Sequence, residues 1–131
     1  MKKPVVALSL LLFCFAIAAA GTPGLQKPQD GLALKGLDPV MLVKGKEVKG
    51  DEKFSINRGG FKYLFSSSED KELFAKEPTK FEIQNDGKCA VVPSAEGDPE
   101  LFVVYKERIY IFASEMCVER FKNNPGEYVK D

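Results

Sequence analysis

The feature that most constrains the fold is an internal repeat. The segment from Arg108 to Tyr128, RIYIFASEMCVERFKNNPGEY, has a near copy 47 residues earlier, FKYLFSSSEDKELFAKEPTKF, from Phe61 to Phe81. The same spacing relates Gly50-Asp51 to Gly97-Asp98, and no gap is needed to align the copies. Self-similarity at one fixed period indicates that a supersecondary unit has been duplicated.

Each copy begins with a predicted β-hairpin. Apolar residues alternate with polar ones on both sides of a short turn, at Gly59-Gly60 in the first copy and Lys106-Glu107 in the second. In the second copy Tyr110 and Phe112 fall on the opposite face of the strand, so both faces are expected to be covered. The alternating positions are Phe54, Ile56, Phe61, Tyr63 and Phe65, and then Leu101, Val103, Tyr105, Ile109 and Ile111.

A short helix is predicted after each hairpin, because the same start and stop signals occur in both copies. The signals are, in order, the serine caps Ser66–Ser68 and Ser114, the core aromatics Phe74 and Phe121, and the terminating prolines Pro78 and Pro125. Short apolar strands are expected before the hairpins, within residues 37–43 and 89–92. The predicted fold class is α+β: two repeated antiparallel β-hairpin plus short helix units, packed as one small domain with a shared aromatic core.

The N-terminus has the pattern of a secretory signal peptide over residues 1–20. Lys2 and Lys3 precede an apolar run from Val5 to Ile17 that is too short for a membrane span, and Ala18–Ala20 offers a cleavage site. Cys14 is expected to be removed with this peptide. We therefore expect an exported protein, periplasmic or secreted, without a membrane span after cleavage. A flexible leader is expected at 21–34, and a domain at 35–131 with units at about 38–84 and 85–131.

Charge and composition exclude several functions. Nineteen basic and nineteen acidic residues balance, and no basic cluster indicates a nucleic-acid partner. The chain has no histidine, which removes the commonest general base and the commonest metal ligand. The paired carboxylates, such as Glu69-Asp70, are expected to be solvated. We therefore expect no enzymatic activity and no catalytic residue.

The repeat resembles a known family, the YHS domain. Tyr-x-Phe-x-Ser, then a helix with Phe, then proline and an aromatic is similar to that family, as is the Asp-Pro-Val opening in Gly36–Val40. The resemblance covers about residues 34–131 and implies a small exported domain. Many YHS domains resemble treble-clef-like metal binders with an opening cysteine and a later cysteine pair.

The resemblance implies which positions are candidate metal ligands. The second cysteine of the family's pair matches Cys117, and the first falls at Ala113. The opening cysteine falls at Met41 in the first unit and near Cys89 in the second. Asp70 takes the place of Cys117 in the first unit, where a carboxylate is an ordinary choice at a helix start. A closed site of four thiolates or imidazoles therefore cannot be built within this chain.

The local sequence predicts where the Cys117 thiol lies. With Ser114 as the N-cap, Cys117 is the third helical residue, near the positive end of the helix dipole, which favours a thiolate. It lies four residues before Phe121, so both share one helix face and Cys117 should be at least half buried. Cys89, on the segment that opens the second unit, is the expected neighbour.

Three interpretations of Cys89 and Cys117 stay open. The first is a disulfide, which would contribute about 3 to 4 kcal/mol by closing a loop of about thirty residues. The second is a soft-metal site for an ion such as copper, with Met116 or Met41 as a thioether ligand. Met116 points some 100° away from Cys117 on the helix, which weakens it as a ligand. The third is two buried free thiols that act as small apolar residues.

The expected function is that of a non-enzymatic exported YHS-type binding domain, with Cys89 and Cys117 as candidate ligands for a soft transition metal. The alternative is a structural or protein-interaction module that a Cys89–Cys117 disulfide stabilises. The expected partner is accordingly a metal ion or another protein.

Overall fold

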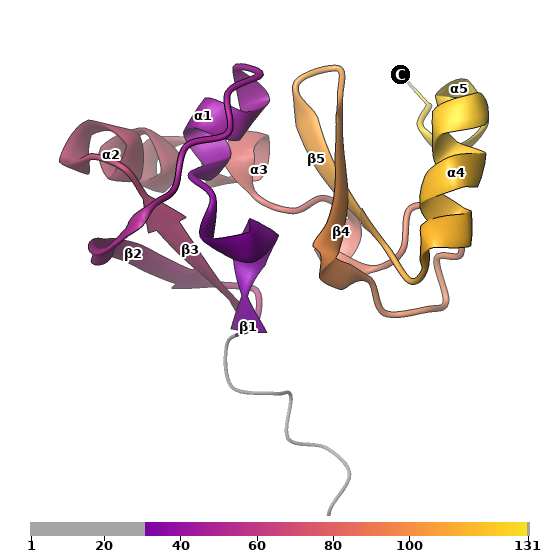
Figure 1. Ribbon diagram of the computed structural model, residues 1–131, viewed down its shortest axis with the longest axis horizontal. Helices are drawn as coiled ribbons and strands as arrows, with labels where there is room; N and C mark the ends of the chain where they lie inside the picture. The colour runs from indigo at the N-terminus through magenta and orange to yellow at the C-terminus, as the bar shows by residue number, and fades with distance from the viewer. Residues whose placement is uncertain (1–30, 131) are drawn as a thin grey trace, which may run out of the picture.

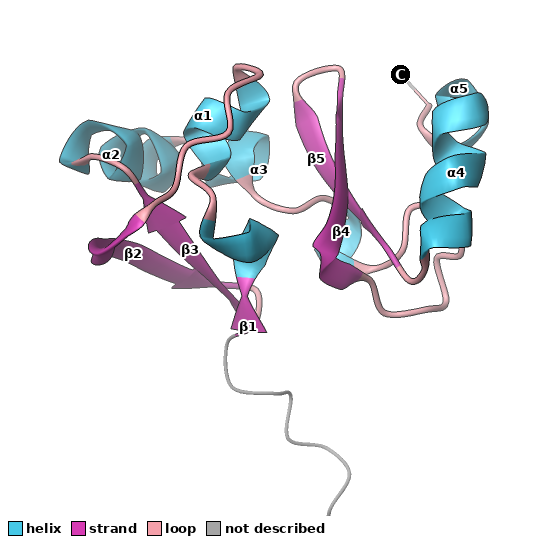
Figure 2. Ribbon diagram, viewed as in Figure 1, coloured by secondary structure: helices cyan, strands magenta, loops and turns pink. Residues whose placement is uncertain are grey.

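The computed structural model describes residues 31–130, which form two units side by side (Figure 1). Unit one contains β1 (Gly31–Leu32), the short turn η1 (Ala33–Gly36), α1 (Pro39–Val43), β2 (Asp51–Arg58), β3 (Phe61–Phe65), α2 (Ser68–Lys76) and α3 (Pro78–Phe81). Unit two contains the turn η2 (Asn85–Gly87), β4 (Asp98–Tyr105), β5 (Arg108–Phe112), α4 (Glu115–Asn123) and α5 (Pro125–Tyr128). The α+β fold class is confirmed (Figure 2).

Both predicted hairpins are present. β2 pairs antiparallel with β3, and β1 adds to β3 in parallel, which gives a three-stranded sheet in the order β1-β3-β2. β4 and β5 form a separate two-stranded antiparallel sheet. Every boundary of β2, β3, α2 and α3 recurs 47 residues later in β4, β5, α4 and α5. The period read from the sequence is therefore also the period of the elements.

The recurring Gly-Asp pair has a structural role in both units. A Cβ placed on Gly50 would lie 2.4 Å from the backbone carbon of Leu64, and one on Gly97 would lie 2.4 Å from Cγ1 of Ile111. The aspartate that follows each glycine accepts a hydrogen bond of 2.9 Å from the N–H two residues later. The hairpin register then shifts just beyond it. Glycine is required here because no side chain fits against the neighbouring strand.

The helices begin and end where the sequence predicts. Ser67 and Ser114 are the N-caps of α2 and α4, and each hydroxyl accepts a hydrogen bond from the third helical N–H. Each helix stops before a proline that begins a further short helix, α3 or α5. Phe74 and Phe121 are each 1% exposed, so each helix is anchored to its own sheet by one aromatic side chain.

The buried side chains form two clusters, which corrects the expectation of one shared aromatic core. The first cluster centres on Tyr63, Phe65 and Phe74, and the second on Phe112 and Phe121. β5 contributes to both: Ile109 and Ile111 face the first cluster, while Tyr110 and Phe112 face the second. The expectation that both faces of this strand are covered is confirmed. β4 also packs side chains on both clusters, so the β4–β5 hairpin joins the units.

Two local predictions are wrong. The apolar segment after Asp38 is the helix α1, because the Asp38 side chain caps its N–H groups and Pro39 is preset for a first helical turn. Residues 89–92 form no strand beyond a single bridge from Cys89 to Ile111, because the chain turns back at once. An apolar run of four or five residues does not by itself distinguish helix, strand and turn.

The predicted flexible leader is also wrong where the structure describes it. Gly31–Leu32 is the strand β1, and Ala33 and Leu34 are completely buried in the first cluster. The predicted signal peptide at 1–20, with Cys14, and the leader up to residue 30 lie outside the described residues.

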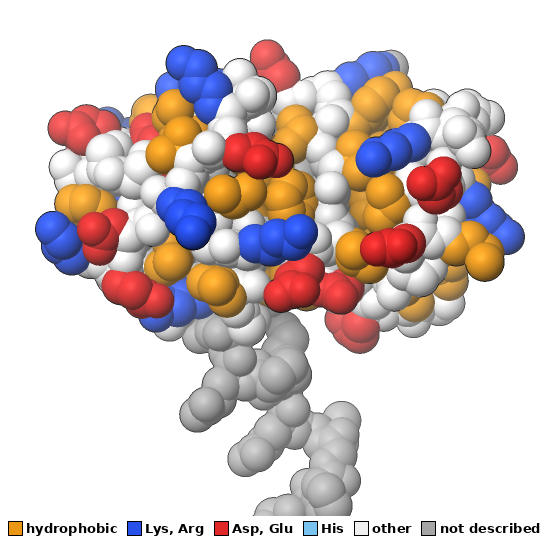
Figure 3. Space-filling model, in the orientation of Figure 1, with side chains coloured by type: hydrophobic (Ala, Val, Ile, Leu, Met, Phe, Trp, Pro, Cys, Tyr) orange, Lys and Arg blue, Asp and Glu red, His pale blue; other side chains and the backbone are white. Residues whose placement is uncertain are grey.

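The surface agrees with the balanced charge of the chain. Acidic and basic side chains are interspersed over the face in Figure 3, and neither sign gathers into a large patch. Within residues 31–130, no helix is both long and apolar enough to cross a bilayer.

Candidate functional site

The fold brings Cys89 and Cys117 together at the end of β5. The backbone of Cys89 bridges to Ile111, and the N–H of Ala90 donates to the Ile111 carbonyl at 3.0 Å. Two residues after β5 ends, Ser114 caps α4, and Cys117 is the third residue of that helix. The Cys117 thiol donates a hydrogen bond to the sulfur of Cys89. Both cysteines are free thiols, and the Cys117 side chain lies near enough to Cys89 to favour its ionisation.

Both thiols are buried. Cys89 is 1% exposed and Cys117 is 8% exposed, and they belong to the second cluster with Ala90, Phe112 and Phe121. Apolar walls on several sides keep bulk water from the sulfurs. A charge at this site therefore has to be stabilised by groups of the protein itself.

Three backbone N–H groups supply that stabilisation for Cys89. They belong to Val91, Val92 and Ala113, and the Val92 nitrogen lies 3.4 Å from the Cys89 sulfur. Burial acts to raise the pKa of Cys89, but these N–H groups and the Cys117 thiol outweigh it and hold the pKa below its ordinary value of 9.0. We call these four donors the thiol cradle. The thiol cradle therefore favours the thiolate form of Cys89.

Cys117 is held by the helix cap. Its N–H donates to the Ser114 hydroxyl oxygen at 3.4 Å, and the same hydroxyl donates to the Cys117 sulfur at 3.5 Å. This reciprocal contact fixes the thiol at the start of α4, from where it reaches Cys89. The burial predicted for Cys117 from its spacing to Phe121 is confirmed.

Unit one has a corresponding acceptor that the sequence analysis missed, Asp38. Its side chain is fully buried and accepts from the N–H groups of Val40 at 2.8 Å and Met41 at 3.2 Å. The N–H and hydroxyl of Ser66 donate to its other oxygen at 2.8 and 2.7 Å. The Asp70 side chain also hydrogen-bonds to Asp38. We call this arrangement the carboxylate cradle.

The carboxylate cradle corrects the expectation that Asp70 is a solvated helix-start residue. Asp70 is only 8% exposed, and burial together with the neighbouring Asp38 raises its pKa to about 6. Burial acts to raise the pKa of Asp38 too, but the hydrogen bonds from Asp70, Ser66 and Met41 prevail and lower it. Two neighbouring carboxyl groups cannot both ionise easily, so Asp70 keeps its proton up to about pH 6.

The two cradles use equivalent groups. Each acceptor receives the N–H groups two and three residues later, the N–H of the residue after the hairpin, and the side chain of the third helical residue. Asp70 therefore has the same role toward Asp38 as Cys117 has toward Cys89, that of a side-chain donor from the third helical position. Two sequence signals point to Asp38: its place before Pro39 as an N-cap, and the occurrence of Asp70 at the position of Cys117.

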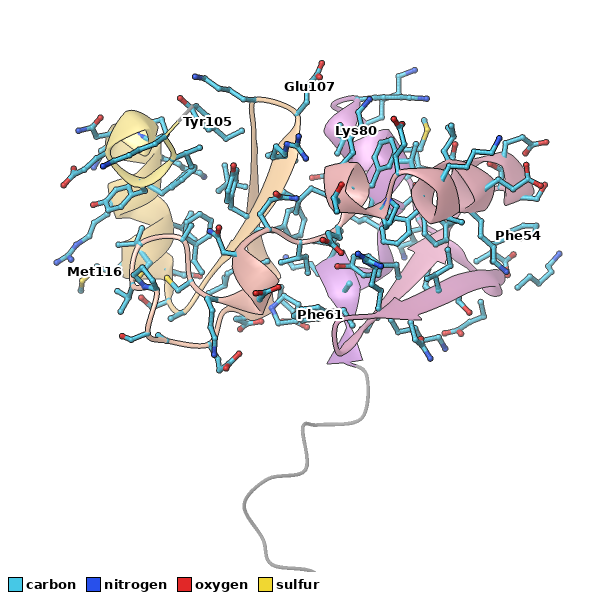
Figure 4. All side chains as sticks on the ribbon, turned by 180° about the vertical axis from the view of Figure 1, so that it is seen from behind. Phe54, Phe61, Lys80, Tyr105, Glu107 and Met116 are labelled. Atoms are coloured by element: carbon cyan, nitrogen blue, oxygen red, sulfur yellow. The ribbon has the colours of Figure 1, made fainter. Side chains whose placement is uncertain are left out.

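The structure does not bring Met41 or Met116 into the thiol site. Met116 is 64% exposed and lies at the outer edge of unit two (Figure 4). Met41 belongs to α1 of unit one, where its N–H serves the carboxylate cradle. The two sulfurs of Cys89 and Cys117 are thus the soft donors that the fold places together.

Other candidate sites contribute little. Among residues 31–130, no three His, Cys, Asp or Glu side chains gather as a metal-binding group. A cleft of about 430 Å³ opens between the α2–α3 junction and the β4–β5 turn, with Lys80 and Glu107 on its two sides (Figure 4). Its lining residues belong to neither cradle and are of mixed charge. The buried thiol and carboxyl groups therefore lie outside this cleft.

In comparisons with known proteins, no family model matches the chain, and no curated protein and no solved structure matches it significantly. The resemblance to the YHS domain therefore depends on the short motifs of the repeat alone.

Proposed function

We propose that this chain is a small, non-enzymatic, exported YHS-type binding domain whose Cys89–Cys117 pair binds one soft metal ion, Cu(I). The observation that supports the proposal is the proximity of two free thiols, both buried in the second cluster, where Cys117 acts on the ionisation of Cys89. Thiolate sulfur selects soft cations, and Cu(I) is stable with two ligands.

The thiol cradle supports metal binding in two ways. It lowers the pKa of Cys89, so a thiolate ligand is available at lower pH than from an ordinary cysteine. Its three backbone N–H groups also point at the sulfur that would carry negative charge in the complex, as hydrogen bonds around a metal thiolate do. Binding would take both sulfurs as thiolates, so the two thiol protons would be released to solvent as the ion binds.

The number of donors favours Cu(I) over zinc. A structural zinc site requires four ligands, usually cysteine or histidine. The chain has no histidine, and the described residues place two thiols and no third metal-binding side chain together. The exposed Met116 does not add a ligand within unit two. Two-coordinate binding is the chemistry that this donor set suits.

The same contact favours a second function, that of a structural or interaction module with a Cys89–Cys117 disulfide. Thiol–disulfide exchange with a small-molecule disulfide would join the two sulfurs, and the reagent would leave as two thiols. Closing this loop would stabilise the domain by about 3 to 4 kcal/mol. Disulfides are common in small exported domains, whose cores are limited.

One experiment separates the two functions. The exported protein is purified without reductant, and its intact mass is measured with and without thiol alkylation, together with its metal content. Copper at one ion per chain, with both thiols alkylated after the metal is removed, supports the metal site. A mass lower by two protons, with no alkylation, overturns it and supports the disulfide.

Two variants sharpen the result. Cys117→Ser should abolish stoichiometric binding when the reduced protein is titrated with Cu(I) against a competing chelator. Met116→Leu, one residue away, is the matched control and should bind as the wild type does. Retained binding in Cys117→Ser would contradict the proposed ligand pair, and lost binding in Met116→Leu would contradict a two-ligand site.

A further inference from the structure

The carboxylate cradle joins three separate elements of unit one. Asp38 caps α1, Ser66 follows β3, and Asp70 is in the first turn of α2. Ser66 bridges the two acids, because its hydroxyl lies 2.7 Å from one Asp38 oxygen and 3.3 Å from an Asp70 oxygen. The connection between α1 and α2 at this point therefore depends on a network of hydrogen bonds between two carboxyl groups.

This network stabilises one negative charge but not two. Asp38 already receives two N–H groups from α1 as well as both groups of Ser66. The remaining contact, from Asp70 to Asp38, exists only while one of the acids holds a proton. If that proton is lost, the contact becomes a repulsion between two buried carboxylates.

We infer that the Asp38–Asp70 pair is a pH-sensitive latch, which holds α1 and α2 to the end of β3 while it keeps a proton and loosens when the proton is lost. The latch belongs to unit one and is independent of the thiol site, so it extends the proposed function without resting on it. It acts on the first cluster, to which α1 contributes Val40 and α2 contributes Phe74.

The charged groups around the latch do not remove this repulsion. From α1, the charge of Lys44 lowers the pKa of Asp70, but burial and Asp38 outweigh it. The neighbouring charges of the sheet are engaged elsewhere, since Arg58 pairs with Glu82 and Lys62 with Glu52.

Three further charged residues lie on neighbouring turns of the helices. On α3, the Lys80 ammonium lies 5.4 Å from the Phe81 ring centre. On α2 itself, Glu69 and Lys71 flank Asp70 in the sequence, with opposite charges.

The direction of the pH effect follows from which state binds the proton. Asp70 is protonated in the folded chain up to a pKa of about 6, whereas in the unfolded chain it titrates near 3.8. Between these values the folded state binds the extra proton, so stability falls as the pH rises and is then level above about 6. Asp38, with its lowered pKa, acts in the opposite direction below pH 3.8.

The test compares the wild type with Asp70→Asn, which keeps a hydrogen-bond donor toward Asp38 but cannot ionise. Urea midpoints are measured from pH 4.5 to 7.5. The wild-type midpoint should fall from pH 4.5 to about 6 and stay level above it. That of Asp70→Asn should stay level throughout and be the higher of the two at pH 7.5. Glu69→Gln, at the exposed neighbouring position, is the control and should fall as the wild type does.

A second measurement uses the wild type alone, so the latch can be refuted even if a variant does not fold. The carboxyl carbon of Asp70 should titrate near pH 6 by NMR, and the protection of the Val40 and Met41 N–H groups against hydrogen exchange should fall above it. The Val91 and Val92 N–H groups of the thiol cradle are the internal reference. An Asp70 titration near 3.8, or an Asp70→Asn midpoint that still falls, would overturn the inference.

Discussion

Asp38 and Cys89 are the buried acceptors of two equivalent cradles, although they are not 47 residues apart in the sequence. The spacing differs because the helix α1 follows Asp38, whereas only a tight turn follows Cys89. The donors on the other side, at the residue after the hairpin and at the third helical position, keep the period. One arrangement of N–H groups thus stabilises a carboxylate in unit one and prepares a thiolate in unit two.

Replacing Asp38 by alanine should destabilise the protein strongly. Two N–H groups of α1 and both groups of Ser66 would lose their acceptor in a buried site, with an expected cost of about 3 to 5 kcal/mol in the free energy of unfolding. Asp98→Ala, which removes an exposed acceptor of one N–H, should cost no more than about 1 kcal/mol. Equal urea midpoints for the two variants would show that the carboxylate cradle stabilises the fold no more than an exposed hydrogen bond does.

The thiol cradle predicts which cysteine ionises first. Cys117→Ala removes a donor to the Cys89 sulfur, so the pKa of Cys89 should rise and its thiolate absorbance in the ultraviolet should appear at higher pH. In the reduced wild type the folded-state pKa is the lower one, so stability should increase with pH from that value up to about 9.0. A titration that Cys117→Ala leaves unchanged would refute the hydrogen bond; Met116→Leu is the control.

Adding one methyl group to Gly97 should disturb the packing of β5. The new Cβ would lie 2.4 Å from Cγ1 of the fully buried Ile111, and we expect a cost of about 1 to 3 kcal/mol. Gly126→Ala is the matched control, because a Cβ there meets nothing within 4 Å, and it should change stability by less than about 0.5 kcal/mol. The midpoints of thermal unfolding of the two variants are compared. An unchanged midpoint in Gly97→Ala would mean that β5 can shift to accommodate the new Cβ.

The two helices should contribute equally to stability. Phe74 and Phe121 are each 1% exposed and each packs against at least two aromatic rings. Phe74→Ala and Phe121→Ala should therefore each cost about 3 to 5 kcal/mol. Leu73→Ala, beside Phe74 and 38% exposed, should cost less than about 1 kcal/mol in the same urea measurement. A small effect at one phenylalanine alone would show that the units are not packed alike.

Three short segments adopt structures that differ from those their local sequences predict, and the differences share one cause. The segments after Asp38 and after Cys89 are both short apolar runs, and the interpretation as strands used apolar character without the capping signal. The frequent glycines and prolines before Ala33 and Leu34 predict a flexible leader, yet both residues are fully buried. In each case, contacts with residues distant in the chain decide a local structure that the local sequence leaves open.

By itself, the sequence determined the two hairpins, the two capped helices and their period. The signals are alternating side chains, serine caps such as Ser114 and terminating prolines. They act through neighbouring backbone groups, so the local sequence is enough to predict their effect. Only the tertiary structure decided that the β4–β5 hairpin joins two clusters and that Asp70 meets a buried Asp38. It also decided that the anion is stabilised at Cys89. Those outcomes depend on which N–H groups converge on a side chain from distant segments, and no local pattern specifies that convergence.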